Sequence, residues 1–174
     1  MNAWAFSWVG AGDNHGFDLT ISRLIRAPRA LVWSARADPE SFAQWWIPAP
    51  LQCRVVAMDL RPGGSFVTEM SADGGRFTPH LSGCFLSIAE AERIIFTNAL
   101  VHGWRPAAAF YPTPITATIT FKDHPDGTEY TSRVMHKDRR DRDRHEELGF
   151  HDGWGTVAGQ LAALVEKRAA ERVG

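Results

Sequence analysis

The chain has 174 residues, of which 44% are hydrophobic and 22% are charged, and its formal net charge is −1. This length suits one ordinary domain with its own core, and 19 basic against 20 acidic residues argue against a general nucleic-acid-binding surface. No apolar run reaches membrane-spanning length and no signal peptide is apparent, so a cytoplasmic protein is expected. Seven tryptophans and ten phenylalanines predict either a broad core or a lined cavity.

The first elements are one strand and two short helices. Residues 1–16 are expected to form an N-terminal extension, either a short strand or a loosely docked tail. Alternating apolar residues predict a strand over 17–26. Pro28 is suited to open a helix at its first turn, and Asp38-Pro39 supplies the cap and first residue of a second helix.

The middle of the chain is rich in strand-like runs separated by short, mostly glycine-rich breaks. These runs cover 51–60, 65–71, 76–90, 93–101, 115–123 and 128–137. With the first strand they make about seven, and the short connections predict an antiparallel sheet.

The last segment, 139–171, is predicted as one long helix. Its apolar residues fall within an arc of about 100°, the width of a stripe that faces a core. The expected fold class is therefore α+β: a curved antiparallel sheet of about seven strands wrapped around a long C-terminal helix, with two short helices between strands 1 and 2. A single domain is expected over 17–171.

Four segments of this layout carry a family likeness: 21–46, 59–66, 82–97 and 148–166. On these residues the chain resembles the SRPBCC superfamily, also called START-like or birch-pollen-allergen-like. Within it, the chain resembles homologues of the activator of the heat-shock-protein-90 ATPase (AHSA-like proteins). The resemblance implies a helix-grip fold with a hydrophobic cavity between the sheet and the last helix. Members of this superfamily include lipid carriers, metabolite binders, cyclases and co-chaperone domains.

The candidate ligand-binding residues are large side chains, most of them aromatic, and a few polar groups, all placed where they can reach one interior. They are Trp46, Phe66, Met70, His80, Phe96, Trp104, Phe110, Tyr111, His136, Glu147, Phe150, His151 and Trp154. The aromatic members either line a pocket or simply form the core. Three of them lie on the connection 102–114, which is expected to act as a lid over the pocket.

The polar candidates suggest acid–base chemistry as one hypothesis. His136 shares its strand parity with apolar residues, so it is expected to face inwards. Continuing the helical arc places Glu147 at one end of the cavity, beside His151. The alternative is a solvated, charged helix start with hydrogen-bonded structural histidines. No metal or cofactor is expected, because the sequence lacks HExxH, paired-cysteine, phosphate-loop and dinucleotide motifs.

Three functions remain open from the sequence. The first is binding of a small hydrophobic ligand, such as a lipid, an aromatic compound or a polyketide-like metabolite. The second is an enzyme of the same fold that carries out cyclisation, dehydration or hydrolysis. The third is a protein-interaction module that stimulates a chaperone ATPase. Gly155 and Gly159 lie on the predicted outer side of the last helix, where they either accept a second copy in a homodimer or are merely tolerated.

Overall fold

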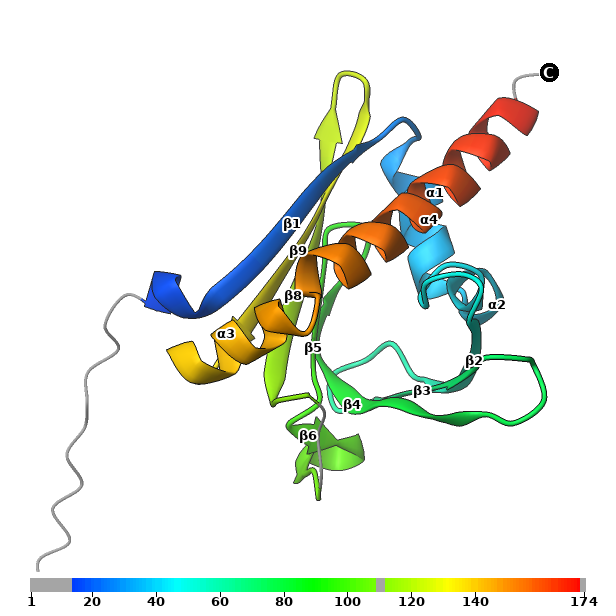
Figure 1. Ribbon diagram of the computed structural model, residues 1–174. Helices are drawn as coiled ribbons and strands as arrows, with labels where there is room; N and C mark the ends of the chain where they lie inside the picture. Colours follow the sequence, from blue (N-terminus) through cyan, green and yellow to red (C-terminus); the bar gives the residue numbers. More distant parts are fainter. Residues whose placement is uncertain (1–13, 109–111, 173–174) are drawn as a thin grey trace, which may run out of the picture.

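The computed structural model describes residues 14–108 and 112–172 (Figure 1). Most of the predicted N-terminal extension therefore lies outside the described residues. Two candidate ligand-binding residues, Phe110 and Tyr111, also lie outside them. The described chain begins with a short 3-10 turn, η1 (Asn14–Phe17).

Within the described residues, a seven-stranded sheet dominates the molecule. Its strands are β1 (Asp18–Ile25), β2 (Gln52–Met58), β3 (Ser65–Ser71), β4 (Thr78–Ala89), β5 (Arg93–Thr97), β8 (Ile115–His124) and β9 (Gly127–His136). Their order is β1-β9-β8-β5-β4-β3-β2, and every neighbouring pair is antiparallel. The predicted α+β class and antiparallel sheet are thus confirmed.

A separate small ribbon interrupts the path from β5 to β8. It pairs β6 (Leu100–Val101) with β7 (Arg105–Pro106) around the 3-10 turn η2 (His102–Trp104). The predicted strand over 93–101 is therefore two strands that belong to different sheets.

Two of the glycine-rich breaks are required by close backbone approach. Gly127 closes the β8–β9 hairpin with φ +144°, and a Cβ there would lie 2.1 Å from the carbonyl oxygen of Ile25. A Cβ on Gly64 would lie 2.0 Å from the carbonyl oxygen of Asp59. A larger residue at either position would have to displace backbone, so these turns fix where the strands reverse.

Two short helices, α1 (Arg29–Ala37) and α2 (Pro39–Ala43), lie between β1 and β2, as predicted. The carboxylate of Asp38 accepts a hydrogen bond from the backbone N–H of Ser41 at 2.8 Å, which caps α2.

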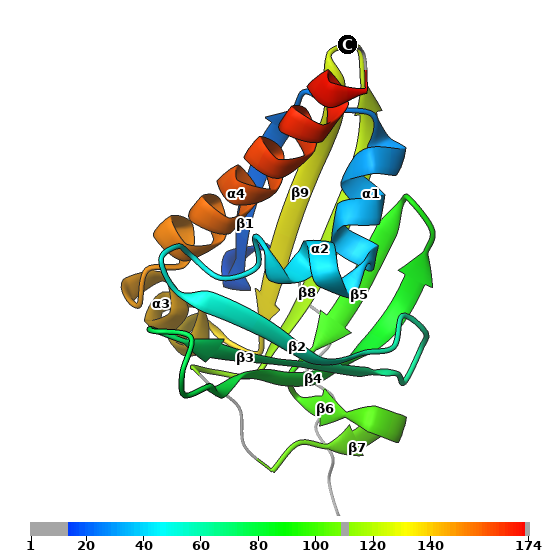
Figure 2. The ribbon, with the colours of Figure 1, turned by 90° about the vertical axis from the view of Figure 1, so that its right-hand side faces the viewer.

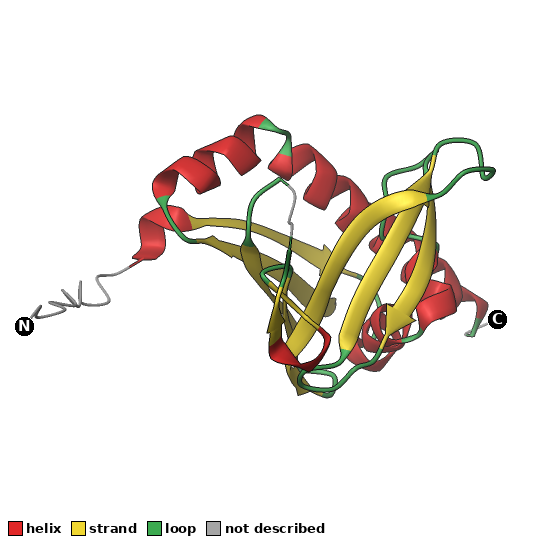
Figure 3. Ribbon diagram, turned by 90° about the horizontal axis from the view of Figure 1, so that it is seen from below, coloured by secondary structure: helices red, strands yellow, loops and turns green. Residues whose placement is uncertain are grey.

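The C-terminal helix α4 (Phe150–Glu171) runs diagonally across the concave face of the sheet, and α1 and α2 lie beside it (Figure 2). Viewed from below, the strands curve around the space that the helices cover (Figure 3). The predicted stripe explains the contact, because Val157, Leu161 and Val165 are buried there. None of the described helices combines the length and apolar character needed to cross a bilayer.

The predicted single helix over 139–171 is in fact two helices. The first, α3 (Arg139–Glu147), ends at Leu148, and α4 begins after Gly149. Gly149 has φ +92°, a left-handed conformation that favours glycine, and its N–H donates to the carbonyl of Glu146 at 3.0 Å. The break changes the direction of the chain, so the helical arc cannot be continued from α4 back into α3.

Candidate functional site

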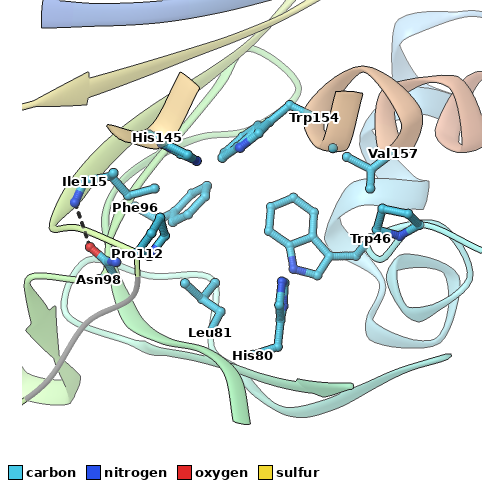
Figure 4. Close-up of a pocket in the computed structure, with 12 residues that line it drawn as sticks. Trp46, His80, Leu81, Phe96, Asn98, Pro112, Ile115, His145, Trp154 and Val157 are labelled. Carbon is cyan, nitrogen blue, oxygen red and sulfur yellow. Dashed lines mark hydrogen bonds between the residues drawn. The ribbon is translucent and has the colours of Figure 1, made fainter. Parts of the chain in front are cut away.

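A pocket of about 190 Å³ lies between α4 and the sheet (Figure 4). Its wall combines the segment after α2, strands β4, β5 and β8, the connection between β5 and β8, helix α3 and the start of α4. The lining residues are Trp46, Pro48, His80, Leu81, Phe96, Asn98, Pro112, Ile115, His145, Gly153, Trp154 and Val157. This is the position in which the sheet and the last helix were expected to enclose a cavity.

Three aromatic rings form much of the apolar wall. The Trp46 ring meets Phe96 edge to face at 6.1 Å and meets Trp154 in the same way at 6.0 Å. Each ring comes from a different element, because Phe96 lies on β5 and Trp154 lies on α4. Such rings present flat apolar surfaces that suit a flat, apolar ligand.

The adjacent residues Trp45 and Trp46 have different environments. The indole N–H of Trp45 donates to the carbonyl of Ala35 at 3.0 Å, and the whole residue is buried in the core. Trp46 turns its ring to the pocket, and its indole N–H has no hydrogen-bond partner among the described residues. This N–H is enclosed by the surrounding protein, and a buried donor without a partner lowers stability.

The side chain of Gln160 on α4 holds the segment that carries Trp46. Its amide NH₂ donates to the carbonyl of Trp45 at 2.8 Å and to that of Ile47 at 2.9 Å. Its amide oxygen accepts from the N–H of Ala49 at 2.7 Å. One side chain of the helix therefore fixes the loop opposite, which sets the width of the pocket.

His80 and Asn98 supply polar groups on the sheet side. The Nδ1 atom of His80 lies 3.0 Å from the hydroxyl of Thr68, and the ring stands edge-on to Trp46. His80 keeps contact with solvent, but the surrounding walls lower its pKa by desolvation. The amide of Asn98 bonds the backbone of Thr113 and Ile115, so it shapes the wall and has little capacity left for a ligand.

His145 of α3 is the most unusual group in the wall, and it was not among the site residues predicted from the sequence. Its Nδ1 atom lies 2.9 Å from Nε2 of His136, whose Nδ1 atom lies 2.8 Å from the carbonyl oxygen of Phe17. Both histidines are buried. Desolvation, with the His136 ring adding to it, lowers the pKa of His145 to about 4. The imidazole of His145 is therefore neutral near pH 7.

Arg36 of α1 lies behind this wall, fully buried. Its guanidinium is 4.6 Å from the ring centre of Phe42 and 5.4 Å from that of Trp46. None of its three nitrogens has a hydrogen-bond partner among the described residues. Burial lowers the pKa of Arg36 to about 10, and the nearby Tyr130 hydroxyl opposes this shift. The side chain still carries its charge near pH 7.

The structure brings four of the predicted residues together in the pocket wall, namely Trp46, His80, Phe96 and Trp154. Three others are buried just behind it. Phe66 stacks on Phe85 in the core, Phe150 packs against His145 and Trp154, and His136 supports His145.

The remaining described candidates lie away from the pocket wall. Met70 borders a separate hollow near Leu51, and Trp104 is 48% exposed beside the turn at Gly63. Glu147 and His151 are exposed. The break at Gly149 turns Glu147 away from the position that a continuous helix would give it, whereas His151 lies on α4 itself, outside the buried stripe.

Several lining residues carried no clear signal in the sequence. Val157 belonged to the predicted apolar stripe of the last helix, but it was not named as a site residue. Leu81, Ile115, Pro48 and Pro112 are ordinary apolar residues that line the pocket only through the tertiary fold. Among the described residues there is no cluster of metal-ligating side chains.

A model of one protein family, the activator of Hsp90 ATPase homolog 1-like proteins, matches residues 26–166. The chain belongs to this family. The match covers α1, the whole strand meander and most of α4, so every described residue of the pocket wall lies inside the family region. No curated protein matches the chain.

Several solved structures resemble this member of the activator of Hsp90 ATPase homolog 1-like family over most of its length. A protein from Nitrosomonas europaea is 41% identical, with a TM-score of 0.77 over 88% of this chain and 96% of its own. A protein from Chromobacterium violaceum is 27% identical, with a TM-score of 0.66 over 86% and 96%. A protein from Arthrobacter aurescens, 17% identical with a TM-score of 0.74 over 90% of both chains, shares the fold.

Proposed function

We propose that this protein binds a small, flat and largely apolar ligand in the pocket between α4 and the sheet. The observation that carries the proposal is a pocket of about 190 Å³ walled by the aromatic rings of Trp46, Phe96 and Trp154. A cavity of about 150 Å³ accommodates benzene. The size therefore favours a ligand, or part of a ligand, of one or two rings.

Native mass spectrometry of gently purified protein tests this proposal. We expect a bound small molecule, and we expect Val157→Trp to remove it, because the larger ring would fill the pocket. Thr156→Trp is the matched control, since Thr156 is exposed on the same helix. A wild-type protein that binds neither a co-purified molecule nor any small aromatic compound would contradict the proposal.

An enzyme of the same fold is the second candidate, and the coupled pair of His145 and His136 favours it. A neutral imidazole in an apolar pocket can accept a proton from a substrate, as cyclisation, dehydration or hydrolysis requires. This role is distinguished from binding by turnover. If the protein is an enzyme, the wild type forms product and His145→Gln does not. A pure binding protein forms no product, whether His145 is present or replaced.

A chaperone partner is the third candidate, and it rests on the name of the family. The exposed large apolar residues in the described part of the chain are Leu24, Leu51, Val56, Trp104 and Leu148. They lie on four separate segments, since Leu51 and Val56 both belong to the β2 region, which gives little support to one docking patch. Stimulation of a chaperone ATPase by the purified protein would favour this role. A cytoplasmic location, a homodimer and a single domain over 17–171 stay predictions.

A further inference from the structure

The hydrogen-bond chain behind the pocket wall fixes which ring nitrogens carry protons. The carbonyl oxygen of Phe17 can only accept, so the Nδ1 atom of His136, 2.8 Å away, must carry a hydrogen. When His136 is neutral, its Nε2 atom is then a lone-pair acceptor. The hydrogen in the 2.9 Å contact must come from Nδ1 of His145.

The protonation state of the other His145 nitrogen is then fixed as well. A neutral imidazole carries one ring hydrogen, so Nε2 of His145 is left with a lone pair. This atom has no hydrogen-bond partner among the described residues, and it is not among the fully enclosed polar atoms. Figure 4 shows the imidazole projecting from α3 towards the rings of Phe96 and Trp154. The pocket thus meets a buried acceptor whose tautomer is set from behind.

We propose that the ligand carries an O–H or N–H group on an aromatic ring, as in a phenol, and that this group donates to Nε2 of His145. The inference rests on the proposed function and names the chemical class that the pocket would take. His136 acts as a positioning residue, because it holds the tautomer and does not line the pocket itself.

The rest of the wall favours an uncharged donor. The described lining residues include no Asp, Glu, Lys or Arg. A carboxylate ligand would meet no charged partner in the wall, and the lone pair of Nε2 would repel it. A phenol places its ring against Trp46 and Trp154 and satisfies the acceptor, so each part of the ligand meets a complementary surface.

The tautomer can be measured directly on the wild-type protein. In a long-range proton–nitrogen NMR spectrum at about pH 8, where an imidazole is unprotonated, we expect the His145 ring to be protonated at Nδ1 and unprotonated at Nε2. The signals are assigned by their loss in His145→Phe. A neutral His145 with its hydrogen on Nε2 would overturn the inference, whatever the variants do.

Two probes of nearly equal shape test the ligand class. Phenol can donate a hydrogen bond and fluorobenzene cannot, so the ratio of their dissociation constants reports the donor. We expect the preference for phenol over fluorobenzene to be about tenfold greater in the wild type than in His145→Phe. The reason is that a site built to accept a hydrogen bond rejects a ligand that lacks the donor. His124→Phe, at the exposed end of β8, is the matched control and should keep the wild-type ratio.

The outcomes separate this inference from the proposed function. If both probes bind and their ratio is the same in the wild type and in His145→Phe, the donor class is wrong while the binding pocket stands. If neither probe binds the wild type, the proposed function fails and the inference fails with it. Should His145→Phe not fold, through-bond correlations from the backbone assign the wild-type ring signals instead, and the tautomer measurement still decides.

Discussion

Arg36 is a buried cation held among aromatic rings. Four ring centres lie within 5.9 Å of its guanidinium, and cation–π attraction offsets only part of the cost of removing it from water. We predict that Arg36→Met raises the free energy of unfolding by about 1–3 kcal/mol, because an apolar side chain of similar length keeps the packing without a buried charge. Urea denaturation would measure this. A loss of stability would show that the favourable interactions of the guanidinium outweigh the free-energy cost of removing it from water.

His145 makes stability depend on pH in a defined window. Its pKa in the folded protein is about 4, below the usual 6.5, so the unfolded chain binds more protons between these values. Stability from this group is complete above pH 6.5 and is lost as pH falls towards 4. Thermal melts of the wild type should show this fall, and His145→Phe should show a shallower one. In His145→Phe some dependence of stability on pH should remain, because the pKa of His80 is also lowered.

The carboxylates provide an internal check on that window. The pKa values of Asp38 and Asp73 are lowered from 3.8, chiefly by hydrogen bonds from Ser41 and from the backbone N–H of Gly75. Their contributions therefore begin to fall at about pH 5 and are lost mainly below pH 3.8, so most of any loss between pH 6.5 and 5 belongs to histidine. An equal loss of stability between pH 6.5 and 4 in the wild type and in His145→Phe would contradict the assignment to the histidine.

Some residues of the pocket wall could be predicted from the sequence, and others could not. Trp46, Phe96 and Trp154 follow from size and from the inward face of a predicted strand or helix. His145 could not be found in this way, because it lies in a run of charged residues whose helical phase changes at Gly149. Its burial depends on a contact with His136, which only the packing of α3 against β9 creates.

Two glycines of α4 form a natural pair for testing the pocket. A Cβ on Gly153 or on Gly155 would meet no atom within 4 Å, and both residues lie inside the helix. Replacing either with Ala should raise stability by up to about 1 kcal/mol. Gly153 lines the pocket, so Gly153→Ala should also weaken phenol binding, whereas Gly155→Ala should not. Equal phenol affinities for the two variants would place the binding site elsewhere.

The contact between α4 and the Trp46 segment depends on Gln160. We predict that Gln160→Met lowers stability by about 1–3 kcal/mol, because two carbonyls and one N–H lose their partner. It should also weaken ligand binding, since Trp46 is no longer held in place. Gln44→Met is the control, because Gln44 is exposed and its side chain bonds only the carbonyl of Glu40. Unchanged melting of Gln160→Met would show that the loop is held by packing alone.

Element boundaries were predictable where local chemistry sets them. The cap at Asp38 and the glycine turns before β3 and β9 mark real boundaries, because capping and backbone approach act over a few residues. The break at Gly149 was missed, since a glycine within a helical pattern does not reveal its φ angle. The predicted strand 93–101 is two strands in the structure, because the side chains of Thr97 and Asn98 form hydrogen bonds with the backbone of Ile115. This contact joins residues that are distant in sequence.

At the scale of the whole molecule, the pocket exists because the sheet and the C-terminal helix differ in shape. A twisted antiparallel sheet curves away from a straight helix, and the two touch fully only along part of their length. Large rings fill most of the space that remains, and the pocket occupies the part next to Trp46 and Trp154. The sequence predicted the sheet and the helix. It could not predict the volume between them, because that volume is the small difference between backbone curvature and side-chain size.

The most direct test of this account is an NMR titration of the indole N–H signals with phenol. We expect the signals of Trp46 and Trp154 to shift and saturate together, because both rings line the pocket. The signals of Trp45, buried and bonded to Ala35, and of Trp104, exposed at η2, should stay in place. Saturable shifts confined to Trp104, or no saturable shift at Trp46 and Trp154, would contradict the account.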